Sequence, residues 1–263
     1  MSAPPVVISV EDVTIAYGEV VIQHDLRFEV RRGEVFVILG GSGCGKSSLL
    51  KNMIGLYRPA RGRILFDGED IATAEGDERL RLLRKFGVMY QSGALFGSMT
   101  VLENVRLPLD EFTDLAGEEK DLVAAAKLNQ VGLLDAAARK PSALSGGMQK
   151  RAGIARAMAL DPGILFLDEP SAGLDPITSA GLDQTIRELS KGLGITFVVV
   201  THELPSIYAI ADRCVMLDAR TKTMIAEGKP AELRDHSPDP SVRQFFLREA
   251  APLPATEKGS PSP

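Results

Sequence analysis

One stretch, GGSGCGKS at Gly40–Ser47, constrains the fold of this chain more than any other. It fits the pattern G-x-x-x-x-G-K-[ST], in which glycines let successive backbone N–H groups turn toward one anion. The apolar run VFVIL at 35–39 precedes it and is typical of a buried strand, and the stretch SLLKNMI at 48–54, typical of a helix, follows it. A strand, a glycine-rich turn and a helix N-terminus together form a phosphate-binding loop. We therefore expect an α/β fold that holds a nucleotide at this turn.

The expected phosphate site takes its ligands from consecutive residues. Lys46 can reach the β- and γ-phosphates, and the Ser47 hydroxyl can hold Mg²⁺. A nucleotide with Mg²⁺ is therefore the expected ligand. The residues expected to contact it here are Gly40, Gly41, Ser42, Gly43, Cys44, Gly45, Lys46, Ser47 and Ser48.

The composition bounds the setting of the chain. Hydrophobic residues make up 44% and charged residues 25% of the 263 residues, which is ordinary for a globular protein. The formal net charge of −5 gives no electrostatic footprint for nucleic acid, so no nucleic-acid partner is expected. We expect neither a signal peptide nor a membrane-spanning run. The two cysteines suggest no disulfide framework, so we expect a cytoplasmic protein that reaches a membrane through a partner.

The order of the remaining segments favours a mostly parallel sheet. Alternating apolar residues at 6–17 and 27–30 indicate antiparallel strands with one solvated face, and 64–66 adds another short strand. Residues 87–90 predict a strand before a loop, and most of 101–160 is typical of helix. Buried strands at 164–167 and 196–200 then enclose a helix at 176–189. Apolar strands that alternate with helices predict a parallel sheet covered on both faces.

Two carboxylates end one of these buried strands. Asp168 and Glu169 follow the run ILFL at 164–167, and a carboxylate there is costly unless it meets a cation or another partner. Beside a phosphate loop that partner is Mg²⁺, which places Asp168 in its coordination sphere, directly or through water. Glu169 can orient and deprotonate a water for in-line attack on the γ-phosphate.

The motifs, taken in order, carry a family resemblance. Leu144–Gln149, with sequence LSGGMQ, resembles the signature motif of the ATP-binding-cassette (ABC) family. The resemblance covers nearly the whole chain. The other matching segments are the adenine-stacking aromatic residue Tyr17, Walker A at Gly40–Ser47, the Q-loop glutamine Gln91, Walker B at Ile164–Glu169, the D-loop at Ser171–Asp175 and the switch histidine His202.

The resemblance implies an architecture. It consists of a RecA-like P-loop core with a mostly parallel sheet, an antiparallel β subdomain and an α-helical signature subdomain. We expect one ABC ATP-binding domain over residues 1–250, with the helical subdomain at about 92–160. Residues 251–263 are rich in proline, serine and charge and are expected to be disordered.

The resemblance also implies that the site is shared between two protomers. Ser145, Gly146 and Gly147 leave N–H groups open at a helix start, which is a second anion site. In the family this site faces the γ-phosphate held by the opposite protomer, so two ATP molecules are sandwiched between two domains. One set of motifs therefore implies a partner cassette, most simply a second copy of this chain.

Further roles follow from the same resemblance. Gln91 is expected to sense Mg²⁺ and the attacking water, Asp175 to arrange the dimer seam, and His202 to stabilise the transition-state charge. The expected catalytic residues are thus Glu169, His202, Lys46 and Gln91; the expected metal-holding residues are Ser47, Gln91 and Asp168; and Tyr17, Ser145, Gly146 and Gly147 complete the ATP contacts.

A transporter subunit is the expected use of this ATPase. A non-transport ABC ATPase is the first alternative, although the two cassettes or the long coiled-coil insertion usual in such proteins are missing. A P-loop kinase or GTPase is the second; it is disfavoured by Ser145–Gly147, by His202 and by the lack of an Asn-Lys-x-Asp segment.

The Q-loop continuation hints at the cargo. Gln91–Val101 and SGGMQKR at 145–151 resemble ATPases of the Mla and mammalian-cell-entry (MCE) type, which move phospholipids between membranes in bacteria. The resemblance implies a permease that docks near Gln91–Val101, MCE-domain and small accessory subunits, and a peripheral position on the cytoplasmic face of the inner membrane. Transport of another solute, such as an amino acid or a lipoprotein, is the alternative.

Three further features are left open by the sequence. Met148 replaces the glutamine usual after Ser-Gly-Gly, and activity is expected to survive. Cys44 replaces a serine frequent in Walker A, which predicts ATP-protectable inactivation by thiol reagents. The stripe Val242, Phe245 and Phe246 predicts a terminal helix that packs either on its own domain or on the neighbouring protomer.

Overall fold

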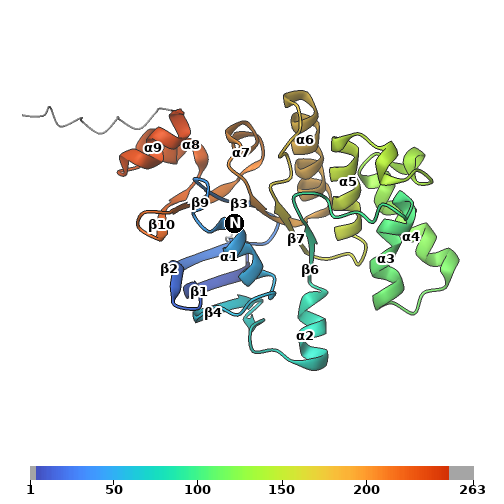
Figure 1. Cartoon of the computed structure of the whole chain (residues 1–263), viewed down its shortest axis with the longest axis horizontal. Coiled ribbons are helices and arrows are strands. Elements are labelled where there is room, and N and C mark those ends of the chain that lie inside the picture. The colour runs from blue at the N-terminus through green and yellow to red at the C-terminus, as the bar shows by residue number, and fades with distance from the viewer. Residues whose placement is uncertain (1–3, 249–263) are drawn as a thin grey trace, which may run out of the picture.

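The computed structural model describes residues 4–248, which form two sheets and a helical lobe (Figure 1). The six-stranded sheet has the order β10-β9-β3-β8-β7-β6, and the four-stranded sheet the order β2-β1-β4-β5. In the larger sheet β10 pairs antiparallel with β9, and the other pairings are parallel. Its strands are β3 (Val35–Gly40), β6 (Phe86–Met89), β7 (Ile164–Asp168), β8 (Thr196–Val200), β9 (Arg213–Asp218) and β10 (Thr223–Gly228).

Alternate side chains of the larger sheet face two different apolar layers. Val37 and Leu39 of β3 lie in a cluster that includes the helical lobe and the C-terminal helices. Phe36 and Ile38 of the same strand lie in a second cluster that includes the smaller sheet. Because successive strand residues point to opposite faces, both faces are apolar. This explains why these strands are continuous hydrophobic runs in the sequence.

The smaller sheet is antiparallel and lies at the side of the core away from the helical lobe (Figure 1). It consists of β1 (Val6–Tyr17), β2 (Val20–Arg31), β4 (Arg61–Phe66) and β5 (Glu69–Asp70). β2 is longer than the expected 27–30. The polar triplet Gln23-His24-Asp25 interrupts its alternation, and the pairing with β1 shifts register near Asp25, whose φ is 52°.

The helices cover the core and form the lobe. Their bounds are α1 (Lys46–Met53), α2 (Gly76–Leu83), α3 (Val101–Phe112), α4 (Gly117–Gln130), α5 (Gly146–Ala157), α6 (Pro176–Leu193), α7 (Leu204–Ile210), α8 (Pro230–His236) and α9 (Pro240–Leu247), with short 3₁₀ turns η1 (Leu134–Ala136) and η2 (Pro141–Ala143). Helices α3 to α5 make up the lobe at the right of Figure 1, where the sequence predicts a helical subdomain.

Local sequence rules set several helix ends. α3 begins with a capping box in which the Thr100 hydroxyl accepts from the Glu103 N–H and the Glu103 carboxylate accepts from the Thr100 N–H. α6 begins at Pro176, with the Asp175 carboxylate accepting from two N–H groups, and ends at Gly194 in the left-handed region. The Asp175 carboxylate therefore serves as a helix cap within its own chain.

The C-terminal helix α9 packs on its own domain, the first of the two alternatives. Val242 is fully buried and Phe246 is 4% exposed, and the Tyr208 hydroxyl on α7 donates to the Phe246 carbonyl at 3.3 Å. The predicted tail at 251–263 lies outside the described residues. Within residues 4–248, no helix has the length and apolar character needed to cross a membrane.

Candidate functional site

The phosphate loop is built as the sequence predicts. The fully buried strand β3 leads through Gly41–Gly45 into α1. Gly43 and Gly45 have φ of 75° and 94°, a region that side-chain-bearing residues avoid. Gly45 is the N-cap of α1, and no side chain caps the helix there. The first N–H groups of α1 are therefore free of a side-chain acceptor, which suits an anion.

Lys46 and Gln23 fix the conformation of this loop. The Lys46 Nζ, 8% exposed as a residue, donates to the carbonyls of Gly40 at 2.9 Å and Gly41 at 3.0 Å. The Gln23 side chain, fully buried on β2, donates to the Cys44 carbonyl at 2.6 Å and the Asp218 carbonyl at 3.1 Å. Gln23 is a structural contributor that the sequence patterns did not single out, because it belongs to no motif.

Ser47 and Asp168 come together beside the loop although 121 positions separate them. The Ser47 hydroxyl donates to Asp168 Oδ1 at 3.5 Å. Burial and the neighbouring Glu169 charge raise the pKa of Asp168, and Lys51 and Lys46 oppose the rise. A bound cation would relieve both effects. Among residues 4–248 no group of three or more His, Cys, Asp or Glu could hold a metal.

Glu169 and His202 form the opposite wall of the site. Glu169 follows β7 in the left-handed region, with φ of 46°, and its N–H donates to the Val200 carbonyl at 2.8 Å. His202 Nδ1 lies 2.8 Å from Glu169 Oε1. The other carboxylate oxygen, Oε2, is buried and has no hydrogen-bond partner among the described residues. A buried acceptor of this kind favours a water molecule as its partner.

A cleft of about 470 Å³ joins these parts. Its lining brings together ten residues from five places in the sequence: Ile22, Ser42, Gly43, Gly45, Lys46, Ser47, Ser48, Gln91, Glu169 and His202. All four residues expected to be catalytic thus lie around one cavity. Ile22 of β2 also lines the cleft, although the sequence did not predict it.

Tyr17 lies at the edge of the loop, and its hydroxyl donates to Ser48 Oγ at 3.3 Å. Tyr17 is 43% exposed, and its ring meets that of Tyr57 edge-on, with 5.8 Å between the ring centroids. Two exposed tyrosines beside a phosphate loop offer a face for a base. Tyr57 was not expected, because it lies in a loop outside the recognised motifs.

The signature residues lie outside the lining of the cleft. Ser145 is the N-cap of α5, and its hydroxyl accepts from the Met148 N–H at 3.3 Å. A Cβ on Gly147 would lie 2.3 Å from Thr178 Cγ2, so glycine here also lets α5 approach α6 closely. Ser145 and Gly146 are exposed. The second expected anion site is therefore an open surface, apart from the phosphate loop of the same chain.

Two cationic side chains of helix α5 also hold the Q-loop, through hydrogen bonds to carbonyl groups of the loop. The buried Lys150 donates from Nζ to the Gln91 carbonyl. Arg156 donates to the Gly93 carbonyl at 3.0 Å and the Ala94 carbonyl at 2.8 Å. Burial lowers the pKa of Lys150, and the nearby charges of Glu169 and Asp168 oppose this. The sequence patterns missed both cations, although each lies on the signature helix.

The structure argues against the expected reactivity of Cys44. The residue is 2% exposed, and burial raises the pKa of its thiol. Its Sγ packs so close to Gly40 that a Cβ there would lie 2.6 Å from it. Cys44 therefore fills the space under the loop as a small apolar side chain. The sequence shows that Cys44 lies in the loop but not that its side chain faces the protein interior.

Comparison with known proteins agrees with this geometry. A family profile described as ABC transporter matches residues 23–172. The intermembrane phospholipid transport system ATP-binding protein MlaF of Escherichia coli (strain K12) is 41% identical over 239 residues, covering 91% of this chain and 88% of that protein. The probable ribonucleotide transport ATP-binding protein mkl of Mycobacterium leprae is 40% identical over 254 residues, covering 96% of this chain and 72% of that protein.

Solved structures are similar over most of the chain. The ATP-binding cassette MJ0796, solved as a dimer in a post-hydrolysis state with ADP and Pi, has a TM-score of 0.75 and 32% identity and covers 84% of this chain and 98% of its own. The cbiO1 protein of Clostridium perfringens, part of the ABC transporter complex cbiONQ, has a TM-score of 0.80 and 29% identity and covers 92% of this chain and 95% of its own. The chain therefore belongs to the ABC transporter family as an ATP-binding protein whose ATP hydrolysis is coupled to transport.

Proposed function

We propose that this chain is the ATPase subunit of a bacterial transporter that moves phospholipid between the inner and outer membranes. The observation that carries the ATPase part is the convergence of Lys46, Gln91, Glu169 and His202 on one cleft. In this proposal the N–H groups of the phosphate loop and the Lys46 ammonium bind the β- and γ-phosphates of ATP. Tyr17 and Tyr57 receive the adenine.

Hydrolysis in this proposal uses the Glu169–His202 pair. The Glu169 carboxylate, which contacts His202 Nδ1 at 2.8 Å, orients a water and accepts its proton. His202, with its side chain 55% exposed toward the cleft, donates a hydrogen bond to the γ-phosphate as charge develops there. Ser47, Asp168 and Gln91 would hold Mg²⁺, which neutralises phosphate charge when it is bound.

A second protomer completes the proposed site. Ser145 and Gly146 are exposed at the start of α5, outside the cleft, so the N–H groups at this start can meet a phosphate that another chain holds. A second copy of this chain is the simplest partner. The dimeric MJ0796 cassette with ADP and Pi supports this arrangement.

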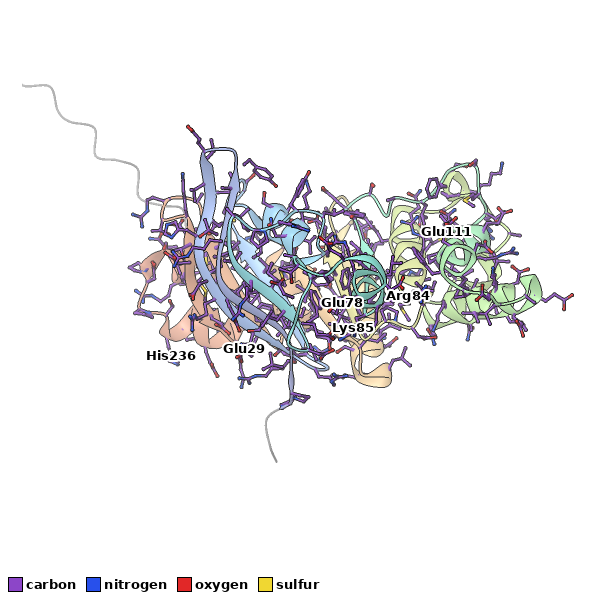
Figure 2. The ribbon with its side chains drawn as sticks, turned by 90° about the horizontal axis from the view of Figure 1, so that it is seen from below. Glu29, Glu78, Arg84, Lys85, Glu111 and His236 are labelled. Atoms are coloured by element: carbon purple, nitrogen blue, oxygen red, sulfur yellow. The ribbon has the colours of Figure 1, made fainter. Side chains whose placement is uncertain are left out.

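The proposed permease contact lies between the core and the helical lobe. A groove of about 220 Å³ is lined there by α2, α3, α5 and β6. Leu80 and Phe112 on its rim are each 44% exposed, and the Arg84 guanidinium lies 5.9 Å from the Phe112 ring centroid. Figure 2 labels Arg84, the C-cap residue of α2, and Glu111 of α3. Phe96, within the expected docking segment Gln91–Val101, is also exposed, at 52%. An apolar groove with a charged rim suits a short amphipathic helix.

The cargo is the finer part of the proposal. The phospholipid assignment rests on the similarity to MlaF, which covers 88% of that protein, and on the Q-loop continuation. Two further parts belong to the same proposal: MCE-domain and small accessory subunits as partners, and a peripheral position of this chain on the cytoplasmic face of the inner membrane. The similarity to mkl makes ribonucleotide transport the second candidate.

Two experiments test these parts separately. Glu169→Gln should bind ATP with wild-type affinity, retain the closed dimer and lose turnover by about 100-fold or more, the usual contribution of a general base. Wild-type hydrolysis by this variant would refute the assignment of the base. For the cargo, the complex purified from native membranes should contain an MCE-domain subunit and bound phospholipid. Co-purification with a nucleotide permease would refute the lipid assignment and leave the ATPase assignment intact.

A further inference from the structure

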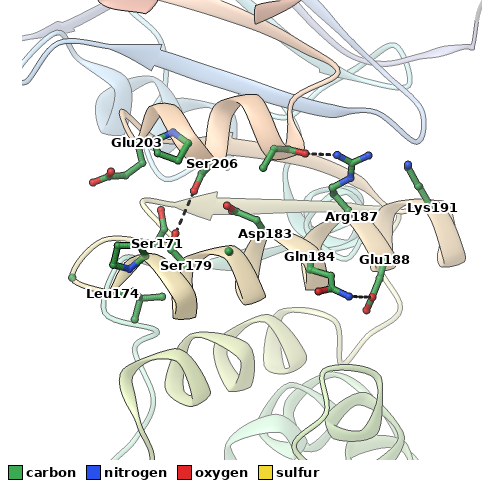
Figure 3. A pocket seen from close by; sticks show the side chains of 15 residues that line it. Ser171, Leu174, Ser179, Asp183, Gln184, Arg187, Glu188, Lys191, Glu203 and Ser206 are labelled. Carbon is green, nitrogen blue, oxygen red and sulfur yellow. Dashed lines mark hydrogen bonds between the residues drawn. The ribbon is translucent and has the colours of Figure 1, made fainter. Parts of the chain in front are cut away.

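A second cavity, of about 670 Å³, opens between α6 and α7, apart from the nucleotide cleft. Its floor is polar and deeply buried: Ser171 is 4%, Asp183 5% and Ser206 3% exposed. The walls include Leu174, Pro205 and Ala209. Figure 3 shows Asp183 projecting from α6 toward α7 at the middle of this cavity. No residue of the floor or walls belongs to the cleft that holds Lys46 and Glu169.

The hydrogen bonding of the floor is incomplete. The Ser171 hydroxyl is buried without a hydrogen-bond partner in the part of the chain that the structure describes. The hydroxyls of Ser179 and Ser206 lie 3.4 Å apart, which is long for such a pair. Burial raises the pKa of Asp183, and the Ser206 hydroxyl is the group that opposes the rise. Such a floor offers a carboxylate and hydroxyl acceptors in a low-dielectric setting.

Nearby cations of the chain do not neutralise Asp183. Arg187, one turn away on α6, donates instead to the Ala209 carbonyl, and Figure 3 shows it directed toward the end of α7. Lys191 lies further along the same helix at the far rim. Within residues 4–248 no lysine, arginine or histidine forms an ion pair with Asp183. The cavity therefore has an uncompensated acidic group at its base.

The shape and lining select the occupant. The cavity is far larger than a monatomic ion, and its apolar walls suit the aliphatic stem of a long cationic side chain. A planar guanidinium can donate to the Asp183 carboxylate and to two hydroxyls at once. Ile177, the residue after the lining residue Pro176, is 85% exposed, and exposed apolar side chains next to a pocket are typical of a protein interface.

We propose that this cavity is a docking site for an arginine side chain of a protein partner other than this chain. The occupant would contact the segment that begins with Ser171, two residues after Glu169, and the helix that follows His202. Docking there would therefore set the spacing of the two segments that carry the Glu169–His202 pair. The proposal does not depend on the cargo that the transporter moves.

The test uses a five-residue blocked peptide with a central arginine, Ac-Ala-Ala-Arg-Ala-Ala-NH₂, and its citrulline counterpart. Citrulline keeps the size and shape of arginine but carries no charge. Amide NMR shifts of the full chain are followed at the α6 and α7 residues that line the cavity. The arginine peptide should give saturable shifts at about millimolar concentrations, the citrulline peptide at least tenfold weaker ones, and Asp183→Asn should abolish the response. Lys191→Ala, at the rim, is the matched control and should retain it.

Four results would overturn the proposal. They are equal binding of the citrulline peptide, no saturable shift with the arginine peptide, equally strong binding of free n-butylamine, and shifts of the same amides on raising the protein concentration alone. The third would assign a free-amine site and the fourth a contact with a second copy. The comparison of the two peptides needs only the wild-type chain, so it stands even if the Asp183 variant fails to fold.

Discussion

Removing the Lys150 ammonium tests whether α5 positions the Q-loop. Lys150→Met keeps the length and apolar stem of the side chain but removes the hydrogen bond to the Gln91 carbonyl. A hydrogen bond from a charged donor contributes about 1.5–3 kcal/mol, and Lys150 is only 7% exposed, so solvent screening is small. If this energy holds Gln91 in its hydrolysis-competent position, kcat should fall about 10- to 100-fold. KM for ATP should stay within about twofold, because Lys150 does not line the cleft.

A matched control lies in the same lobe. Lys127 on α4 is also 7% exposed, but its partner is Asp161, whose side chain is 79% exposed and can be hydrated when the lysine is removed. Lys127→Met therefore removes a buried ammonium without touching the Q-loop and should leave kcat unchanged. Steady-state ATPase assays and thermal unfolding of both variants give the comparison. The reasoning is refuted if Lys150→Met hydrolyses ATP as fast as Lys127→Met, or if the two lose activity in equal measure.

The remaining predictions concern α5, the cysteines and Asp183. Gly147→Ala should lower Tm, because the new methyl group would meet Thr178 Cγ2. Adding Thr178→Ser removes Cγ2 but keeps the hydroxyl that bonds to Asp175, so the double variant should regain the lost Tm. A double variant that stays at the lowered Tm would contradict the packing argument. At pH 8 iodoacetamide should label neither cysteine of the native chain, since burial raises the pKa of Cys214 to about 12 and also raises that of Cys44. Rapid labelling of Cys44 that ATP prevents would instead support the reactivity expected from the sequence. Because the pKa of Asp183 is raised on folding, its ionisation opposes folding. Wild-type stability relative to Asp183→Asn should therefore fall as pH rises above about 4 and level off above the folded pKa; a difference in unfolding free energy that does not change with pH would refute this.

Much of the core could be predicted because its physical rules are local. The strands at β7 and β8 are continuous apolar runs, and Asp175 and Pro176 mark the start of α6. The helix continues past its expected end at 189 to Leu193, where the left-handed Gly194 stops it. β2 could be predicted only in part, since a buried Gln23 and a left-handed Asp25 break its period-2 pattern. The helices after β8 are short. The sequence shows their apolar residues but not the elements on which they pack, which are α6 for α7, and β10 and α9 for α8.

The residues of the site likewise fall into those that the sequence could name and those that it could not. Lys46, Ser47 and Glu169 lie in motifs whose chemistry is fixed by spacing along the chain, so the sequence could name them. Gln23, Lys150 and Arg156 act through partners that lie 21 to 195 residues away in the sequence. Tyr57 acts through a ring contact with Tyr17. Nothing in their own neighbourhood in the sequence marks those partners. Such contacts are determined by the approach of whole elements, which only the folded chain defines.

Helix α5 carries both kinds of residue in one rigid element: residues of a motif and residues that contact a distant segment. Its N-terminus carries the exposed residues Ser145 and Gly146, and its next two turns hold the Q-loop through Lys150 and Arg156. A displacement of the lobe that moves α5 must therefore move both the Gln91 backbone and the signature N–H groups. Gly153 strengthens this link, because a Cβ there would lie 3.3 Å from Gly93 Cα, so the loop packs directly on the helix. A permease that pushes on the groove beside α3 would thus alter two places in a single step: the nucleotide cleft of the protomer that it contacts, and the surface which that protomer offers to the opposite one. The loop would not need to transmit force by itself.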